Sequence, residues 1–186
     1  MAQAFNATAI RTAGVAVFAG LMSMSPARSQ GWTPDAAFVE AGHSRRGTDV
    51  LGLGLKWQWD WQALRWGGRF SAAGEVSASR WAADTVSGSR TQAQFALVPL
   101  LRYTPGEGRS AWFVEAGIGL SLHRRRYEVD DVRMSTRWNF YDVLAVGRRF
   151  GDADEVSLRA VHVSNGGARK PNPGDELILL RWARRF

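Results

Sequence analysis

Residues 112–123 read WFVEAGIGLSLH, and large apolar side chains occupy every second position of this run. The positions between them carry mostly glycine and small or ionisable residues, including Glu115 and His123. A strict period of two is typical of a β-strand whose two faces meet different surroundings. A soluble β-sandwich also alternates. Because glycine crowds one face here while bulky side chains cover the other, the pattern favours a narrow barrel with lipid outside and a tight polar interior.

The same alternation recurs beyond Trp32, where helical periodicity is hard to find. Eight segments can be drawn, at roughly 35–43, 49–60, 68–82, 90–103, 111–127, 135–150, 155–164 and 176–186. The Trp-rich residues 58–68 do not show where their turn lies. Residues 104–108 and 151–154 have the composition of tight turns, which belong on the periplasmic side. The sequence therefore predicts an all-β fold, an eight-stranded antiparallel transmembrane β-barrel formed by residues 30–186.

The N-terminus has the features of an export signal. Arg11 is the one charged side chain before Arg28, and a short apolar run follows it over residues 12–22. The sequence Ala27-Arg28-Ser29 then offers small residues at the two positions that a signal peptidase reads. The apolar run is too short to span a membrane as a helix. We therefore predict that residues 1–29 are a cleaved signal peptide, and that the mature chain crosses a membrane as a closed barrel.

Composition excludes several kinds of chemistry. The chain has no cysteine, so it cannot form disulfides, thiolate metal sites or a cysteine nucleophile. The net charge of +7 suits nucleic acid, an anionic membrane surface or an acidic lipid. The arginines are dispersed among the predicted strands without a recognisable nucleic-acid motif, so no nucleic-acid partner is expected. No cluster of aspartate and histidine suggests a metal, and we expect no cofactor.

Groups suited to ester hydrolysis gather around the loop before the last predicted strand. Residues 162–167 read HVSNGG and residues 170–176 read KPNPGDE, so a histidine, a serine and a carboxylate lie close together. Both termini of an even-stranded barrel lie in the periplasm. The seventh strand therefore rises to the cell exterior with His162 and Ser164 at its end. Glu176 then opens the descending eighth strand.

These three side chains are expected to face the bilayer at its outer edge. The apolar residues that share their faces are Val156, Leu158 and Ala160 on the seventh strand, and Ile178, Leu180, Trp182 and Phe186 on the eighth. The descent from Glu176 to Phe186 covers roughly 25 Å at a strand tilt near 40°, about the height of the apolar band of a barrel. Polar side chains cost least at this boundary, and the ester bonds of membrane lipids lie there too.

Hydrolysis of an acyl ester needs a nucleophile, a base and a group that orients the base. Alternate residues of a strand point the same way, so His162 can reach Ser164, and Glu176 on the adjacent strand can hold the imidazole. The loop supplies donors for a tetrahedral intermediate, namely Asn165, Asn172 and the amides of Gly166 and Gly167. A histidine and a serine two residues apart also fit an ordinary strand end. The carboxylate, the lipid-side placement and the Asn-rich loop favour the esterase.

The two motifs closely resemble the signature of the PagL-type lipid A 3-O-deacylases, including the spacing from His162 to Glu176. That family consists of eight-stranded outer-membrane barrels that remove the ester-linked 3-hydroxyacyl chain at position 3 of lipid A. The resemblance implies that Ser164 is the nucleophile, His162 the base and Glu176 the orienting acid. It also implies an oxyanion site at Asn172 and the Gly167 amide, supported by Asn165. Val163 and Gly166 stand where an aromatic residue and alanine are common, and neither change touches a catalytic group.

The resemblance implies lipopolysaccharide or lipid A as substrate, outer-membrane lipid as surroundings, and a location in the outer membrane. The C-terminal Phe186 resembles the ending of outer-membrane barrels. Two alternatives stay open, a non-enzymatic barrel for adhesion or lipid binding, and an outer-membrane phospholipase. Phospholipases of that kind use a calcium-assisted Asn-His-Ser arrangement in a larger barrel, whereas this chain is shorter and offers an acidic orienting residue. Assembly of the protein as a homodimer also stays open.

Three further sets of charged residues lie outside the two motifs. His43 with Arg45 and Arg46 lies in a predicted extracellular loop, where it could bind lipid phosphate or be a solvated loop. His123 with residues 124–126 lies near the rim of the fifth strand, where it could contact lipopolysaccharide or extend its charges into water. The residues expected to form interior ion pairs, which fill the lumen of small barrels, are Glu75, Glu115 and Arg159.

Overall fold

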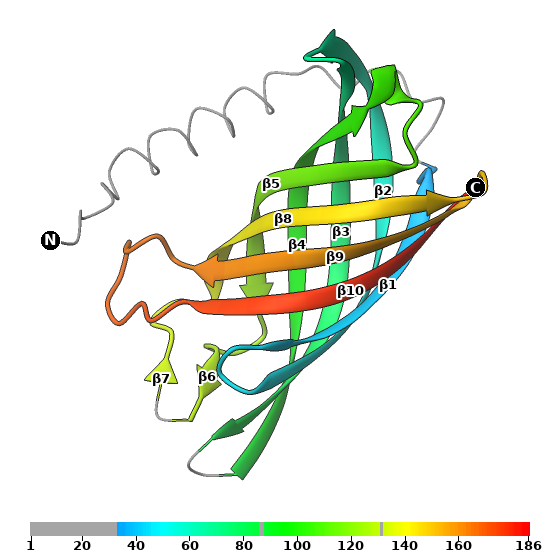
Figure 1. The fold of residues 1–186 in the computed structure, drawn as a ribbon. Helices are drawn as coiled ribbons and strands as arrows, with labels where there is room; N and C mark the ends of the chain where they lie inside the picture. The colour runs from blue at the N-terminus through cyan, green and yellow to red at the C-terminus, as the bar shows by residue number, and fades with distance from the viewer. Residues whose placement is uncertain (1–32, 86–87, 131) are drawn as a thin grey trace, which may run out of the picture.

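The computed structural model describes residues 33–85, 88–130 and 132–186, and the predicted signal peptide at residues 1–29 lies outside them. Within the described residues, eight long antiparallel strands close into a barrel (Figure 1). Their bounds are β1 (Ala36–Ser44), β2 (Thr48–Arg65), β3 (Gly68–Thr85), β4 (Gly88–Pro105), β5 (Trp112–His123), β8 (Trp138–Phe150), β9 (Asp154–Ser164) and β10 (Asp175–Arg185). The predicted eight-stranded antiparallel barrel is therefore confirmed.

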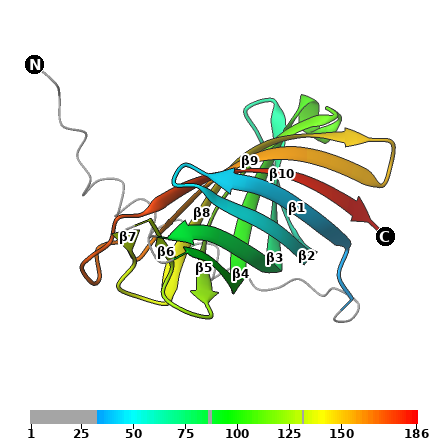
Figure 2. The ribbon, with the colours of Figure 1, turned by 90° about the horizontal axis from the view of Figure 1, so that it is seen from below.

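The barrel closes where its first strand pairs with its last. β1 runs antiparallel to β10, from Ala36 opposite Arg185 to Ser44 opposite Leu177. Closure satisfies the backbone groups of both strands, which lipid could not do. It also brings the loop after β1 beside the start of β10, as both ribbon views show (Figures 1 and 2). Segments from opposite ends of the sequence therefore meet at the extracellular rim.

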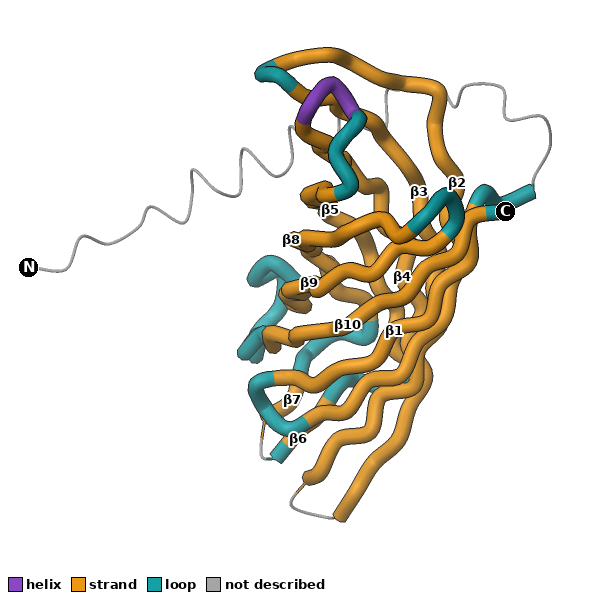
Figure 3. Tube along the Cα trace, turned by 45° about the vertical axis from the view of Figure 1, so that its right-hand side comes forward, coloured by secondary structure: helices purple, strands orange, loops and turns teal. Residues whose placement is uncertain are grey.

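The strands are unequal in length, and two hairpins extend beyond the others at opposite ends (Figure 3). β2, β3 and β4 have 18 residues each, whereas β9 and β10 have 11. The Trp-rich stretch that sequence did not place continues β2 as far as Arg65, past a register shift between Gln58 and Gln62. The chain then turns at Trp66 and Gly67, both with positive φ.

The fifth strand is shorter than the predicted segment 111–127. β5 ends at His123, and three exposed arginines, residues 124–126, follow it. Charged side chains at three successive positions break the alternation that a membrane strand needs. The chain instead forms a loop with a small hairpin of β6 (Glu128–Val129) and β7 (Val132–Arg133), which lies at the same end of the barrel as the loop after β1 (Figure 1).

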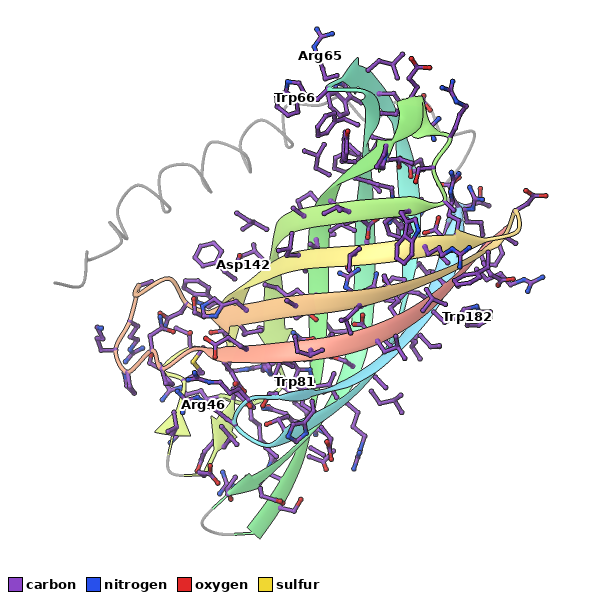
Figure 4. All side chains as sticks on the ribbon, viewed as in Figure 1. Arg46, Arg65, Trp66, Trp81, Asp142 and Trp182 are labelled. Atoms are coloured by element: carbon purple, nitrogen blue, oxygen red, sulfur yellow. The ribbon has the colours of Figure 1, made fainter. Side chains whose placement is uncertain are left out.

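The outer face of the barrel is apolar. Its exposed side chains include Leu51, Leu53, Val76, Phe95, Leu97, Leu120, Leu144, Leu158, Ile178 and Leu180. Trp182 projects from β10 in this way (Figure 4). An apolar exterior over a polar interior is the arrangement of a barrel in lipid. No helix among the described residues has the length and apolar character needed to cross a membrane.

The lumen is closed by buried ion pairs. Arg181 reaches Glu75 at 2.6 Å and Glu40 at 2.7 Å, and Arg159 reaches Glu75 at 2.8 Å. Glu115 pairs with Arg102 at 2.9 Å and, more distantly, with Arg159 at 3.9 Å. The predicted interior ion pairs of Glu75, Glu115 and Arg159 are therefore confirmed. Because this network fills the barrel, a multi-chain lipid cannot enter it.

Candidate active site

His162 and Glu176 face each other on neighbouring strands at the extracellular end of the barrel. The register of β9 and β10 places them directly opposite one another. His162 Nδ1 lies 3.4 Å from Glu176 Oε1, and the two side chains are 42% and 52% exposed. Their neighbours Val161, Val163 and Leu177 point inward and are buried. The pair therefore projects outward, toward the bilayer, as the alternation in the sequence predicts.

Ser164 lies at the last position of β9, on the same outward face as His162. Its Oγ accepts a hydrogen bond from the Gly166 amide at 3.3 Å. Between these two described residues there is no Ser164–His162 hydrogen bond. Catalytic hydrogen bonds of free enzymes are often long and tighten only when substrate binds. The structure thus brings serine, histidine and carboxylate to one rim, with a loop amide already directed at the serine oxygen.

Asn165 holds the loop that follows the serine. It is fully buried, and its Nδ2 donates to Ser135 Oγ at 3.0 Å and to the Arg169 carbonyl at 2.8 Å. Its Oδ1 accepts the Gly167 amide at 3.0 Å, and its own amide donates to Asn172 Oδ1 at 2.9 Å. The side chain of Asn165 therefore stabilises the loop that follows Ser164. Asn172 uses its side-chain oxygen to accept the Asn165 amide, and the Gly167 amide donates to Asn165 Oδ1.

Gly174 is required where the loop returns to β10. Its φ is +66°, a conformation that other residues rarely adopt. A Cβ at this position would lie 3.0 Å from Cε1 of His162. The glycine therefore lets the backbone pass close beside the imidazole without displacing it.

Arg45, in the loop after β1, contacts the same carboxylate. Its Nε lies 3.2 Å from Glu176 Oε2, and its amide donates to the Glu176 carbonyl at 2.8 Å. Glu176 therefore has His162 on one oxygen and an arginine on the other. Sequence reasoning placed Arg45 in an extracellular loop but did not connect it with Glu176, because the contact exists only through barrel closure.

A buried hydrogen-bond network supports the site from the lumen side. Tyr127 donates to Asp175 Oδ2 at 2.6 Å and lies 2.5 Å from Thr48 Oγ1, while Asp175 Oδ1 accepts the Glu176 amide at 2.9 Å. Burial and the Asp175 hydrogen bond raise the pKa of the Tyr127 phenol well above its usual range, so the phenol stays a neutral donor. Sequence reasoning missed this network, because its members come from the loop after β5 and from the first residues of β2 and β10.

Tyr127→Phe is expected to loosen the catalytic rim. It removes the donor to Asp175 and leaves a buried carboxylate oxygen unpaired, a loss of about 1–3 kcal/mol. We expect a lower unfolding temperature and a lower turnover, because Asp175 also holds the Glu176 amide. Tyr103→Phe is the matched control, since it removes the hydrogen bond from an exposed tyrosine to the Trp66 carbonyl at the opposite end of the barrel. Equal losses of turnover in both variants would contradict a specific role for Tyr127.

An open groove of about 1190 Å³ runs over the outer face beside the His162–Glu176 pair. Its wall is largely aliphatic and includes Leu101, Ala116, Ile118, Leu144, Ala160 and Ile178. Polar side chains line its other end, among them Arg45, Glu176 and Asp142, which the β8–β9 register places directly opposite His162 (Figure 4). The groove thus offers an apolar surface with two acidic groups, Asp142 and Glu176, close to the histidine.

A second cavity, of about 590 Å³, opens into the lumen at the periplasmic end. Its lining includes Lys56, Arg102 and Phe186 but none of the three predicted catalytic residues. Among the described residues, no cluster of three or more histidine, aspartate or glutamate side chains could hold a metal ion. The site that brings a serine, a histidine and a carboxylate together with an apolar groove is therefore the one at the His162 end of the barrel.

The model of one protein family, described as lipid A 3-O-deacylase (PagL), matches residues 51–185. The chain belongs to this family. It is 30% identical to the lipid A deacylase PagL of Pseudomonas aeruginosa over 169 residues, which covers 89% of this chain and 93% of the relative. It is 31% identical to the lipid A deacylase PagL of Bordetella bronchiseptica over 122 residues, or 64% of this chain and 65% of the relative.

A solved structure shares the fold. The crystal structure of the outer membrane enzyme PagL matches with a TM-score of 0.72 and 24% identity, and the match covers 81% of this chain and 99% of that one. The family and the apolar-walled barrel together identify the protein as an outer-membrane enzyme, a lipid A 3-O-deacylase.

Proposed function

We propose that Ser164, His162 and Glu176 hydrolyse the ester that holds the 3-hydroxyacyl chain at position 3 of lipid A. The observation that carries this proposal is the outward-facing His162–Glu176 pair, which lies beside Ser164 at one end of an apolar groove. In a soluble esterase such groups would line a cleft. Here they meet the lipid directly, so the substrate reaches them by lateral diffusion in the outer leaflet.

The geometry supports an ordinary serine mechanism. His162 takes the proton of Ser164 as the serine oxygen attacks the ester carbonyl, and Glu176 stabilises the resulting imidazolium. We assign two donors to the tetrahedral oxyanion, the Gly166 amide, which donates to Ser164 Oγ, and Nδ2 of Asn172, whose Oδ1 accepts the Asn165 amide. His162 then gives its proton to the departing sugar oxygen. Water, activated by the same histidine, releases the acyl chain from Ser164 and restores the enzyme.

The groove suits a hydroxylated acyl chain. Its aliphatic wall can cover the chain, while Asp142 supplies one acceptor for a hydroxyl close to the reacting ester. A phospholipid acyl chain has no hydroxyl at this place, which favours lipid A over the phospholipase alternative. The non-enzymatic alternative would not require the ordered loop that Asn165 builds around Ser164.

We infer that residues 1–29 are removed as a signal peptide and that residues 30–186 form the mature barrel. A homodimer is not needed by the proposed mechanism, because all three catalytic groups come from one chain. A membrane barrel of this kind can therefore act as a monomer.

Mass spectrometry of lipid A tests the proposed function directly. Lipid A from cells that express the protein is expected to lose the mass of one hydroxyacyl chain, with position 3 as the site of loss. Lipid A from matched cells without the protein keeps that chain. Loss of a chain from another position, or from phospholipids instead, would refute the proposed reaction.

A further inference from the structure

Arg45 is the one arginine or lysine that lines the outer groove in the described part of the chain. Its side chain is 72% exposed, in contrast to the buried arginines of the lumen. It lies at the end of the groove that contains His162 and Glu176. A cation at this place faces the boundary between the apolar band and the headgroups, where an anionic lipid carries its charge.

The loop that carries Arg45 is fixed on both sides. Ser44 Oγ accepts the amides of Arg46 at 3.2 Å and Thr48 at 3.1 Å, which makes a tight turn. Arg46 then donates from Nε to the Gly174 carbonyl at 3.2 Å, and the Arg45 amide donates to the Glu176 carbonyl. Figure 4 shows Arg46 at this junction between the two loops. The backbone of Arg45 is therefore held against the catalytic strand.

The guanidinium of Arg45 is placed to bind a second anion. Its Nε faces Glu176 Oε2, and among the described residues its two terminal nitrogens have no hydrogen-bond partner. A guanidinium has five donors in a planar fork that fits a phosphate with two parallel hydrogen bonds. The Glu176 contact orients this fork, so the free edge is presented at the rim rather than scattered over many conformations.

We propose that Arg45 is the binding residue for a phosphate group on the lipid A sugars. This inference rests on the proposed function, since it places the sugar beside Ser164 and the acyl chain along the groove. Arg45 then acts as a specificity residue, because it binds the charged headgroup of the molecule whose ester lies at Ser164. Arg46 is less suited to this role, as its Nε is used by the Gly174 carbonyl.

The experiment compares two substrates and three variants. The substrates are purified lipid A and the same lipid A with its sugar phosphates removed, both in micelles of a neutral detergent. The variants are Arg45→Gln, Arg45→Lys and the control Arg126→Gln, which removes one charge from an exposed extracellular arginine outside the groove. Binding is measured separately in the Ser164→Ala background, so that it does not depend on turnover.

Arg45→Gln is expected to raise KM and weaken binding about tenfold on phosphorylated lipid A, the loss of one charge-assisted contact. On the dephosphorylated lipid the same substitution should change KM less than twofold. Arg45→Lys should recover part of the affinity for the phosphorylated lipid. Arg126→Gln should leave KM and binding unchanged for both lipids. Wild-type protein should also bind the dephosphorylated lipid more weakly.

Equal losses on both lipids would overturn the phosphate assignment, because Arg45 would then act through Glu176 or the loop alone. Equal binding of the two lipids by protein with Arg45 intact would overturn it without any substitution. Failure of the proposed function is a separate result, since the wild-type protein would then release no hydroxyacyl chain from either lipid, whatever the binding measurements show.

Discussion

Ser164→Ala is expected to abolish release of the hydroxyacyl chain while leaving a folded barrel. Removal of the nucleophile of a catalytic triad lowers turnover by about 10⁴-fold or more, because the remaining groups cannot form the acyl intermediate. The side chain lies half-exposed at the end of β9 and accepts one hydrogen bond, from the Gly166 amide. Its removal should therefore change the stability of the barrel little. This variant should therefore lose its activity and keep its fold.

The measurement is the rate of hydroxyacyl release from lipid A by purified protein, together with the shift in gel mobility that folded barrels show on heating. Ser157→Ala is the matched control on the same strand. Ser157 points into the lumen and is buried, at 6% exposure, far below the catalytic rim. It should keep both its activity and its fold. Substantial turnover by Ser164→Ala would assign the reaction to another nucleophile.

The strands and their faces were predictable because lipid imposes a simple rule. Every outward position between the two headgroup layers must be apolar, and the inward positions must fit a narrow lumen. Val156, Leu158 and Ala160 follow this rule on β9 and are outward, with Arg159 buried between them. The same alternation predicts that His162 and Ser164 face outward, as they do. The interior pairing of Glu75 with Arg159 follows from the same division of faces.

Contacts at the ends of the strands were not predictable, because no repeating pattern connects them. Tyr127, in the loop after β5, is the buried partner of Asp175, the first residue of β10, and the sequence around Tyr127 suggested a continuing strand. Arg45 meets Glu176 because β1 closes the barrel against β10. Asp142 lies on the outward face of β8 between Phe140 and Leu144. Its place opposite His162 needed the exact register between β8 and β9.

The closed lumen and the exposed site are two consequences of the same barrel size. Eight strands leave room for side chains alone, and here paired charges fill that room. Arg181 bridges Glu40 and Glu75 across the interior, so no lipid can pass that way. A reaction on a membrane lipid must then take place on the outside of the wall. The rim is the one height at which polar catalytic groups and an ester bond meet at small cost.

Ala160→Trp is expected to block the groove and lower kcat/KM about 100-fold. Ala160 points outward two residues below His162 and lines the groove, so an indole there would occupy the path proposed for the acyl chain. A displacement of the ester by about 1 Å from the nucleophile already costs about 100-fold. Tryptophan is tolerated on a lipid-facing surface, so insertion into the membrane should be normal.

The control is Ala78→Trp, the same change on an outward position of β3, outside the groove. It should fold and turn over lipid A at the wild-type rate. Both variants are assayed for hydroxyacyl release at several lipid A concentrations, with heat-dependent gel mobility as the test of folding. Ala160→Trp should fold like its control and differ from it in activity alone. Wild-type activity in folded Ala160→Trp would show that the acyl chain takes another path over the barrel, even if Ser164 is the nucleophile.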